Sequence, residues 1–238
     1  MLRKEDAVKL GVIAVTAISI VMALSVKSTQ AVVEIGTTII AILSALLAVY
    51  ISASYARTRA LPLLFWAIGL WLFTAGVVME VALAFGMYSL LLIDSYLLIV
   101  TLLVEFLALG SLALKNSRRM LYYYSIFIAI TALATVAALA ISSPGLADPS
   151  KIISSHVVYG VLPLPVIAAS SLATFPAAII LIVVAAQSYL KRRSMKMISI
   201  ILGVIVVSIA GTLYIVAYPV LLYFSEFVGI LLLWLGFV

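Results

Sequence analysis

The chain alternates between long apolar segments and short polar connections. A bilayer core of about 30 Å requires about 20 apolar residues for each helical crossing, and eight segments meet this length within a few residues. They run from Asp6 to Val26, Ala31 to Tyr55, Leu61 to Phe85, Tyr88 to Leu114, Met120 to Ile141, Val161 to Leu190, Met195 to Ala217 and Val220 to Val238. The pattern predicts an all-α, polytopic integral membrane bundle of eight transmembrane helices, forming one transmembrane domain over residues 1–238.

The last of these segments, Val220 to Val238, is the weakest candidate for a membrane-crossing helix. It is barely long enough to span a bilayer, and Pro219 separates it from the segment before. The alternative is a bundle of seven spans, followed by a segment that re-enters the membrane or lies along its surface.

One connection is longer than the others and covers residues 142–160. Within it, Asp148 suits a helix N-cap, Pro149 suits the first helical position and Gly160 suits a helix end. We therefore predict an extracytoplasmic loop that contains a short helix at the membrane interface.

The composition indicates that lipid surrounds the protein. With 67% hydrophobic and 9% charged residues, the chain has too few polar side chains to cover its apolar surface in water. It has no cysteine, which excludes disulfides and thiolate metal ligands. Its single histidine, His156, lies in the long connection and is expected to be a surface residue.

The basic residues predict how the bundle is oriented. Twelve of the fourteen Lys and Arg residues form four clusters at segment ends. The clusters are Arg3, Lys4 and Lys9; Arg57 and Arg59; Lys115, Arg118 and Arg119; and Lys191, Arg192, Arg193 and Lys196. If both termini are cytoplasmic, all four clusters lie on the cytoplasmic side of the cell membrane, as the positive-inside rule requires. The net charge of +6 therefore indicates orientation and no nucleic-acid partner.

The tyrosines are expected to form two belts at the membrane interfaces, which favours eight spans over seven. The outer belt would contain Tyr88, Tyr96, Tyr159, Tyr214, Tyr218 and Tyr223, and the inner belt Tyr50, Tyr55, Tyr122, Tyr123, Tyr124 and Tyr189.

Four carboxylic acids on four different segments lie at a similar depth. Each is about 6 to 10 Å below the outer end of its segment at 1.5 Å per residue. They are Glu34, Glu80, Asp94 and Glu226. We expect their carboxyl groups to converge within about 10 Å and to form one site.

A fifth acid lies deeper in the fourth segment. Glu105 follows Asp94 by eleven residues and Thr101 by four, so the three side chains share one face of a helix. They form a polar line from the outer third of the membrane toward its middle.

Buried acids without buried bases need protonation, a bound cation or a water-filled vestibule. Carboxylate oxygens would favour a proton or a hard cation, with the identity of any metal left open. The alternative is that each acid is protonated and hydrogen-bonds to a neighbouring helix.

Other features of the segments concern packing. Pro176 should kink the sixth segment and is a candidate hinge, although a kink that serves packing alone is the alternative. The third segment carries Trp66, Gly69, Phe73, Gly76 and Glu80 along one face. This face could line a cavity for a lipid-like ligand or pack against another helix.

Enzyme motifs such as HExxH, GxSxG, the P-loop and GxGxxG are absent from the sequence. We therefore expect a protein that is not an enzyme, with no catalytic residue and no cofactor.

Two classes of function remain. The first is a small transporter or channel, or a subunit of a transport complex, with an outer carboxylate cluster for a proton or cation. It predicts that Glu105 lines a cavity open to the outer surface. The second is a membrane sensor or assembly subunit that does not transport and binds a lipid-like ligand or partner helices. It predicts acids that face lipid. Candidate partners are the lipid bilayer, other membrane subunits and further copies of the chain.

Overall fold

The structure is a computed structural model that describes residues 29–87, 89–115, 117–142, 163–192, 198–200, 202–203, 206 and 219–237. Within these residues the regular structure is α-helical. The long helices are α2 (Thr29–Thr58), α3 (Leu61–Ala84), α4 (Leu90–Ala113), α5 (Arg118–Ser142), α7 (Leu164–Arg192) and α9 (Pro219–Phe237). The predicted all-α class is confirmed for this part of the chain.

Local signals explain where these helices begin and end. Pro62 stands in the first turn of α3, where its missing N–H breaks no helical bond. The Ser89 side chain caps α4 by accepting a hydrogen bond from the Leu92 amide at 3.1 Å. Arg59 and Gly86 follow α2 and α3 with positive φ angles of 55° and 79°, which turn the chain out of the helix.

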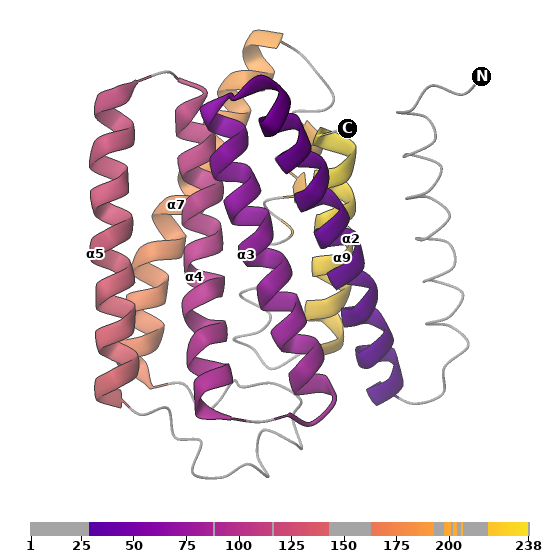
Figure 1. The fold of residues 1–238 in the computed structure, drawn as a ribbon. Coiled ribbons are helices and arrows are strands. Elements are labelled where there is room, and N and C mark those ends of the chain that lie inside the picture. The colour runs from indigo at the N-terminus through magenta and orange to yellow at the C-terminus, as the bar shows by residue number, and fades with distance from the viewer. Residues whose placement is uncertain are drawn as a thin grey trace, which may run out of the picture.

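The helices stand side by side as a bundle in which α2, α3, α4 and α5 alternate in direction (Figure 1). Helix α3 packs between α2 and α4, and α4 also contacts α5 and α7. Helix α9, the last described helix, packs along α2, the first described helix.

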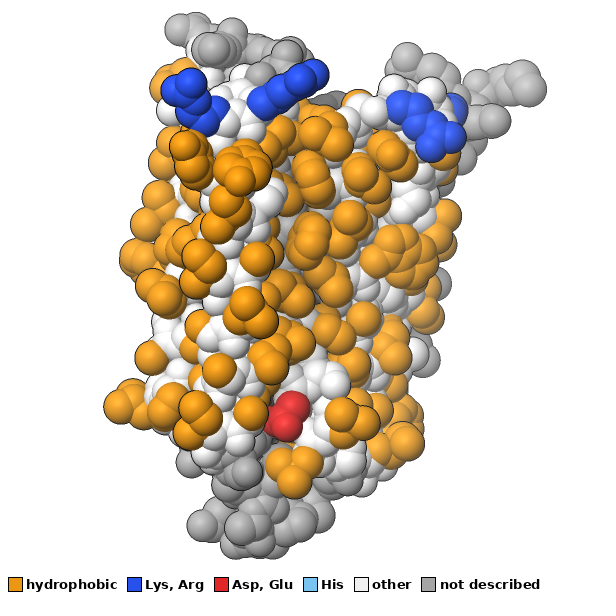
Figure 2. Space-filling view, turned by 60° about the vertical axis from the view of Figure 1, so that its left-hand side comes forward, with side chains coloured by type: hydrophobic (Ala, Val, Ile, Leu, Met, Phe, Trp, Pro, Cys, Tyr) orange, Lys and Arg blue, Asp and Glu red, His pale blue; other side chains and the backbone are white. Residues whose placement is uncertain are grey.

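Five of the helices are long and apolar enough to cross a membrane, namely α2 from Glu34, α3, α4, α5 and α7 to Leu190. Large apolar side chains cover the outside of the bundle, and the exposed fraction is 70% for Leu133, 71% for Phe175 and 84% for Ile141. Figure 2 shows this apolar surface below an end that carries Lys and Arg, with a small acidic patch nearer the opposite end. These features suggest a membrane-embedded, multi-pass protein.

The helix boundaries agree with five predicted segments to within three residues, and α9 covers the predicted segment from Val220 as far as Phe237. The segment Asp6 to Val26, the loop helix after Ser142 and His156 lie outside the described residues. Of the segment Met195 to Ala217, residues 198–200, 202–203 and 206 are described and are helical.

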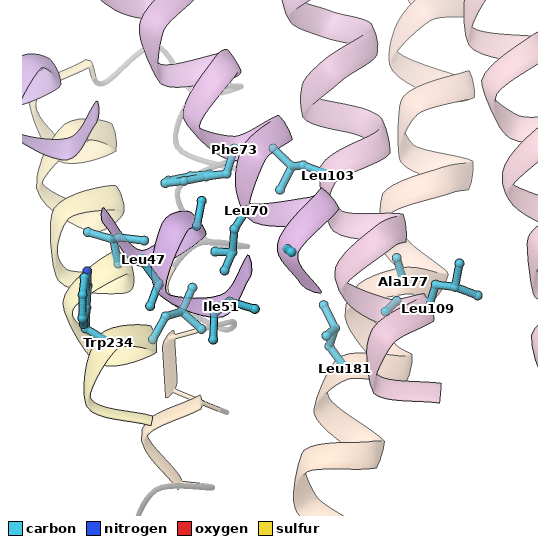
Figure 3. Packing of buried hydrophobic residues seen from close by; sticks show 14 of the residues in the cluster. Leu47, Ile51, Leu70, Phe73, Leu103, Leu109, Ala177, Leu181 and Trp234 are labelled. Carbon is cyan, nitrogen blue, oxygen red and sulfur yellow. The ribbon is translucent and has the colours of Figure 1, made fainter. Parts of the chain in front are cut away.

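The main apolar core lies where α2, α3, α4, α7 and α9 meet (Figure 3). It contains Leu47 and Ile51 of α2, Leu70 of α3, and Trp234 of α9, each at most 5% exposed. Small residues allow close helix contact at its margins, since Ala173 and Ala177 of α7 are fully buried.

The face of α3 that was a candidate cavity wall packs against α4. A Cβ atom at Gly69 would lie 2.8 Å from the Leu107 side chain, and one at Gly76 would lie 3.6 Å from Val100. Trp66 lies against Gly110 of α4. The packing interpretation therefore holds for this face, and the cavity interpretation is wrong for it.

Candidate functional site

Two buried carboxyl groups meet near the end of the bundle that lies opposite the described basic residues. Glu80 of α3 and Glu226 of α9 are 6% and 8% exposed, and their carboxyl groups lie close enough to interact. The Tyr96 hydroxyl of α4 is 2.6 Å from Oε1 of Glu80. The site thus brings together polar side chains from three helices.

The helical hairpin of α3 and α4 brings Glu80 and Tyr96 to the same level. Glu80 lies four residues before the end of α3, and Tyr96 lies six residues after the start of α4. Because the connection between the two helices is short, these positions face each other across the hairpin. Glu226 reaches the same level from α9, which begins at the same end of the bundle (Figure 1).

The oxygen atoms of this pair are not all satisfied. Oε2 of Glu80 and Oε2 of Glu226 are buried and have no hydrogen-bond partner within the described part of the chain. Two ionised carboxylates in contact repel each other, so a proton or a cation between them is needed to hold the pair. The Tyr96 hydroxyl can donate to an ionised Glu80 or accept from a protonated one.

Both carboxyl groups are buried, and apolar side chains lie beside Glu80. Ile93, Tyr96, Leu97 and Val166 form a second buried cluster, with Met79 and Leu83 of α3 packed against it. In such surroundings the interaction between a carboxyl group and a proton or ion is stronger than in water.

Glu105 occupies a separate position at the interface of α4 and α5. It has no exposed surface, and its Oε1 is 2.6 Å from the Thr131 hydroxyl of α5. Thr101 is also buried, but its hydroxyl donates to the Leu97 carbonyl of its own helix at 2.8 Å. The expectation that Glu105 lines a cavity open to the outer surface is therefore wrong for this conformation.

The remaining two acids are half-buried. Glu34 lies five residues into α2, and its carbonyl accepts hydrogen bonds from the hydroxyl groups of Thr37 and Thr38. Asp94 lies near the start of α4 with Oδ1 buried and unpaired among the described residues. The structure thus brings Glu80 and Glu226 together, while one site for all four acids stays a prediction. Acids that face lipid, which the assembly subunit predicts, are not found at Glu80, Glu105 or Glu226.

Two tyrosines that were expected in the interfacial belts lie inside the bundle. Tyr96 is 4% exposed and binds Glu80, and Tyr124 is 8% exposed. Tyr122 and Tyr123, in contrast, are 65% and 64% exposed, as expected of interfacial residues. The sequence pattern indicated the depth of Tyr96 in the membrane. It could not show that Tyr96 lies on the face of α4 that meets α3.

The described residues contain no group of three or more His, Cys, Asp or Glu side chains that could hold a metal ion. Comparison with protein-family models, curated proteins and solved structures found no match for this chain.

Proposed function

We propose that the chain is a small membrane transporter or channel, or a subunit of a transport complex, that binds a proton or cation between Glu80 and Glu226. The observation that carries this proposal is the contact of two buried carboxyl groups on α3 and α9. Ionisable groups buried inside a membrane bundle are costly, and they mark ion and proton paths in such proteins.

Geometry favours the pair over the other acids as the binding site. Its two unpaired oxygens are free to accept a proton or coordinate a cation, and Tyr96 holds Glu80 in place from a third helix. Release requires the pair to open, and a movement of α9 relative to α3 would separate the two carboxyl groups without breaking either helix.

In the proposed topology, eight helices span the cell membrane and both termini lie in the cytoplasm. Support comes from α7 and α9, which run in the same direction (Figure 1). Helix α7 thus ends at the end of the bundle opposite the one where α9 begins, and the 26 residues of sequence between them are enough for one more span. The described Lys and Arg residues lie at one end of the bundle, as the positive-inside rule requires (Figure 2).

A flux measurement tests the proposal. In proteoliposomes with an imposed membrane potential, the purified chain should conduct protons, sodium or potassium, as followed by dyes inside the vesicles. Glu80→Gln and Glu226→Gln should each reduce the flux at least tenfold, because each substitution removes one of the two carboxyl groups that share the proton or cation. Glu105→Gln should have a smaller effect, since Glu105 lies outside this pair.

Thr74→Val is the matched control for the loss of a buried polar group. Thr74 lies on α3 and is 7% exposed, and its hydroxyl donates to the Leu70 carbonyl of the same helix. The control should retain the flux of the native chain. Absence of flux from the native chain itself, with all three ions, would favour a sensor or assembly subunit instead.

A further inference from the structure

Three basic side chains meet at the turn that joins α4 to α5. Lys115 follows α4, and Arg118 and Arg119 stand in the first turn of α5. All three residues are exposed. They belong to the basic end of the bundle, which lies directly above apolar surface (Figure 2).

No described acid lies near these three charges along the chain. Helix α5 contains no acid, and Glu105 of α4 stands ten residues before Lys115 and has no exposed surface. The other described acids lie in the halves of their helices nearer the opposite end of the bundle, namely Glu34, Glu80, Asp94 and Glu226. The positive charge at the turn is therefore left for a group outside the described part of the chain.

The two arginines do not stabilise their own helix. The first turn of a helix carries a partial positive charge, which favours acidic side chains and disfavours basic ones. Helix α5 has no acid in its first turn, and Arg118 and Arg119 stand there instead. The positive-inside rule alone would be met equally well by basic residues in the turn before the helix.

The exposed face of α5 below the arginines is first aromatic and then apolar. Tyr122 and Tyr123 are 65% and 64% exposed, and their ring centroids are 5.7 Å apart. Three apolar side chains follow, which we call the α5 stripe: Ile126, Ile130 and Leu133, exposed by 40%, 59% and 70%. At 3.6 residues per turn, the tyrosines and the stripe lie on the same side of α5 as the two arginines.

The length of this face matches one leaflet of a membrane. Fourteen residues separate Arg119 from Leu133, which corresponds to about 21 Å along the helix. A bilayer with its headgroups is about 40 to 45 Å thick. A lipid whose phosphate lies at the arginines would thus end its acyl chains near Leu133.

We propose that this face of α5 binds an anionic phospholipid, with the phosphate at Lys115, Arg118 and Arg119 and an acyl chain along the α5 stripe. The two tyrosines lie at the level of the interface, where amphipathic aromatic rings are favoured. A soluble phosphate compound or a nucleic acid has no acyl chain to cover the stripe. The site does not depend on the proposed transport function, because it requires only that lipid surrounds the bundle.

Native mass spectrometry of the chain released from detergent micelles counts the lipids that stay bound. From equal amounts of dioleoyl phosphatidylglycerol and dioleoyl phosphatidylcholine, the native chain should retain the first about fivefold or more over the second, because only the first has a net negative charge. Equal retention of the two lipids would overturn the proposal.

The arginines are tested in a double variant, Arg118→Gln with Arg119→Gln. It should lower the preference for phosphatidylglycerol about fivefold or more, since each basic residue near a membrane surface adds to the attraction of anionic lipid.

Arg57→Gln with Arg59→Gln is the matched control. It removes two exposed arginines at the same end of the bundle, at the end of α2, which α3 and α4 separate from α5. The preference should stay within about twofold of the native value, because the attraction falls off within a Debye length. An equal loss in both double variants would overturn the proposal, since the total charge of that end would then attract the lipid.

Two measurements on the native chain test the acyl chain. Glycerol phosphate should compete with dioleoyl phosphatidylglycerol at least about tenfold more weakly than the lipid itself, because it buries no apolar surface. Equal competition would overturn the proposal in favour of a site for soluble phosphate.

A phosphatidylglycerol with a photoreactive group in its acyl chain shows where the lipid lies. Crosslinks to residues 122–133 support the proposal, and crosslinks confined to other helices overturn it. This measurement decides if Arg118→Gln with Arg119→Gln does not fold.

Discussion

At the scale of single residues, the three tryptophans tie pairs of helices together. The indole N–H of Trp66 donates to the Leu107 carbonyl at 3.2 Å, which joins α3 to α4. Trp71 and Trp234 donate to Ser52 Oγ at 3.2 Å and to the Leu43 carbonyl at 3.0 Å, which joins α3 and α9 to α2. Each ring combines apolar packing with one polar anchor, and an indole N–H in lipid has no water as an alternative acceptor.

The contact of Trp66 with Gly110 leads to a prediction about stability. A Cβ atom at Gly110 would overlap the indole ring of Trp66. This ring is held by its hydrogen bond and by an edge contact with Phe237, with 5.0 Å between the ring centroids. We expect Gly110→Ala to lower the free energy of unfolding by about 1 to 3 kcal/mol through overpacking. Equilibrium unfolding in mixed SDS micelles, followed by circular dichroism, measures this change.

Gly36 of α2 provides the control, since a Cβ atom there would have no neighbour within 4 Å. Gly36→Ala should be neutral, or more stable by up to about 1 kcal/mol from helix propensity. Equal effects of the two substitutions would show that Trp66 does not pack tightly on Gly110.

At the scale of elements, sequence pattern predicts helices well and their neighbours poorly. The ends of α3 and α4 follow from Pro62, Gly86 and Ser89, which act within one turn of their own positions. The hydrogen bond between Glu105 and Thr131 could not be predicted in this way. Thr131 belongs to another helix, and the direction of its side chain depends on how α5 is rotated against α4. The depth of the acids was accessible from the sequence, but the pairing of Glu80 with Glu226 was not.

Helix α7 carries the predicted hinge. Pro176 lies inside the helix, between the fully buried Ala173 and Ala177. It cannot donate to the Leu172 carbonyl, and its ring crowds the preceding turn. Pro176→Ala restores this hydrogen bond, and we expect it to reduce the flux at least twofold without loss of stability if α7 bends during transport.

Pro165 offers the matched control for this substitution. It stands in the first turn of α7, where an amide has no helical acceptor. Pro165→Ala should therefore leave the flux unchanged. Native flux in Pro176→Ala would show that Pro176 is not a hinge, and a lower stability of this variant would show that it serves packing.

At the scale of the whole molecule, the described part of the bundle has an apolar lateral surface and one basic end. Large apolar side chains are exposed along α5 and α7, and the described basic residues gather at the end where α4 meets α5 (Figure 2). This distribution is what lipid around the lateral surface and a positive cytoplasmic surface would select. It makes the orientation of the chain an experimental question with a clear answer.

The absence of cysteine makes that question simple to address. Lys115 is exposed after α4 at the basic end, and Met87 is 65% exposed after α3 at the opposite end. In intact cells, a membrane-impermeant maleimide should label Met87→Cys and should label Lys115→Cys only after the cells are opened. The reverse result would invert the proposed topology, and labelling of both from outside would contradict a membrane-spanning bundle.

The contact between α3 and α9 also has a consequence for how the protein is made. Chain segments emerge from the ribosome in order, so Glu80 is synthesised long before Glu226. Tyr96 follows only 16 residues after Glu80 and is its first available partner. The hairpin of α3 and α4 can thus shelter the carboxyl group of Glu80 in a nascent chain until α9 arrives. Loss of the Tyr96 hydroxyl would then lower the yield of inserted protein during biosynthesis, before it affects the folded molecule.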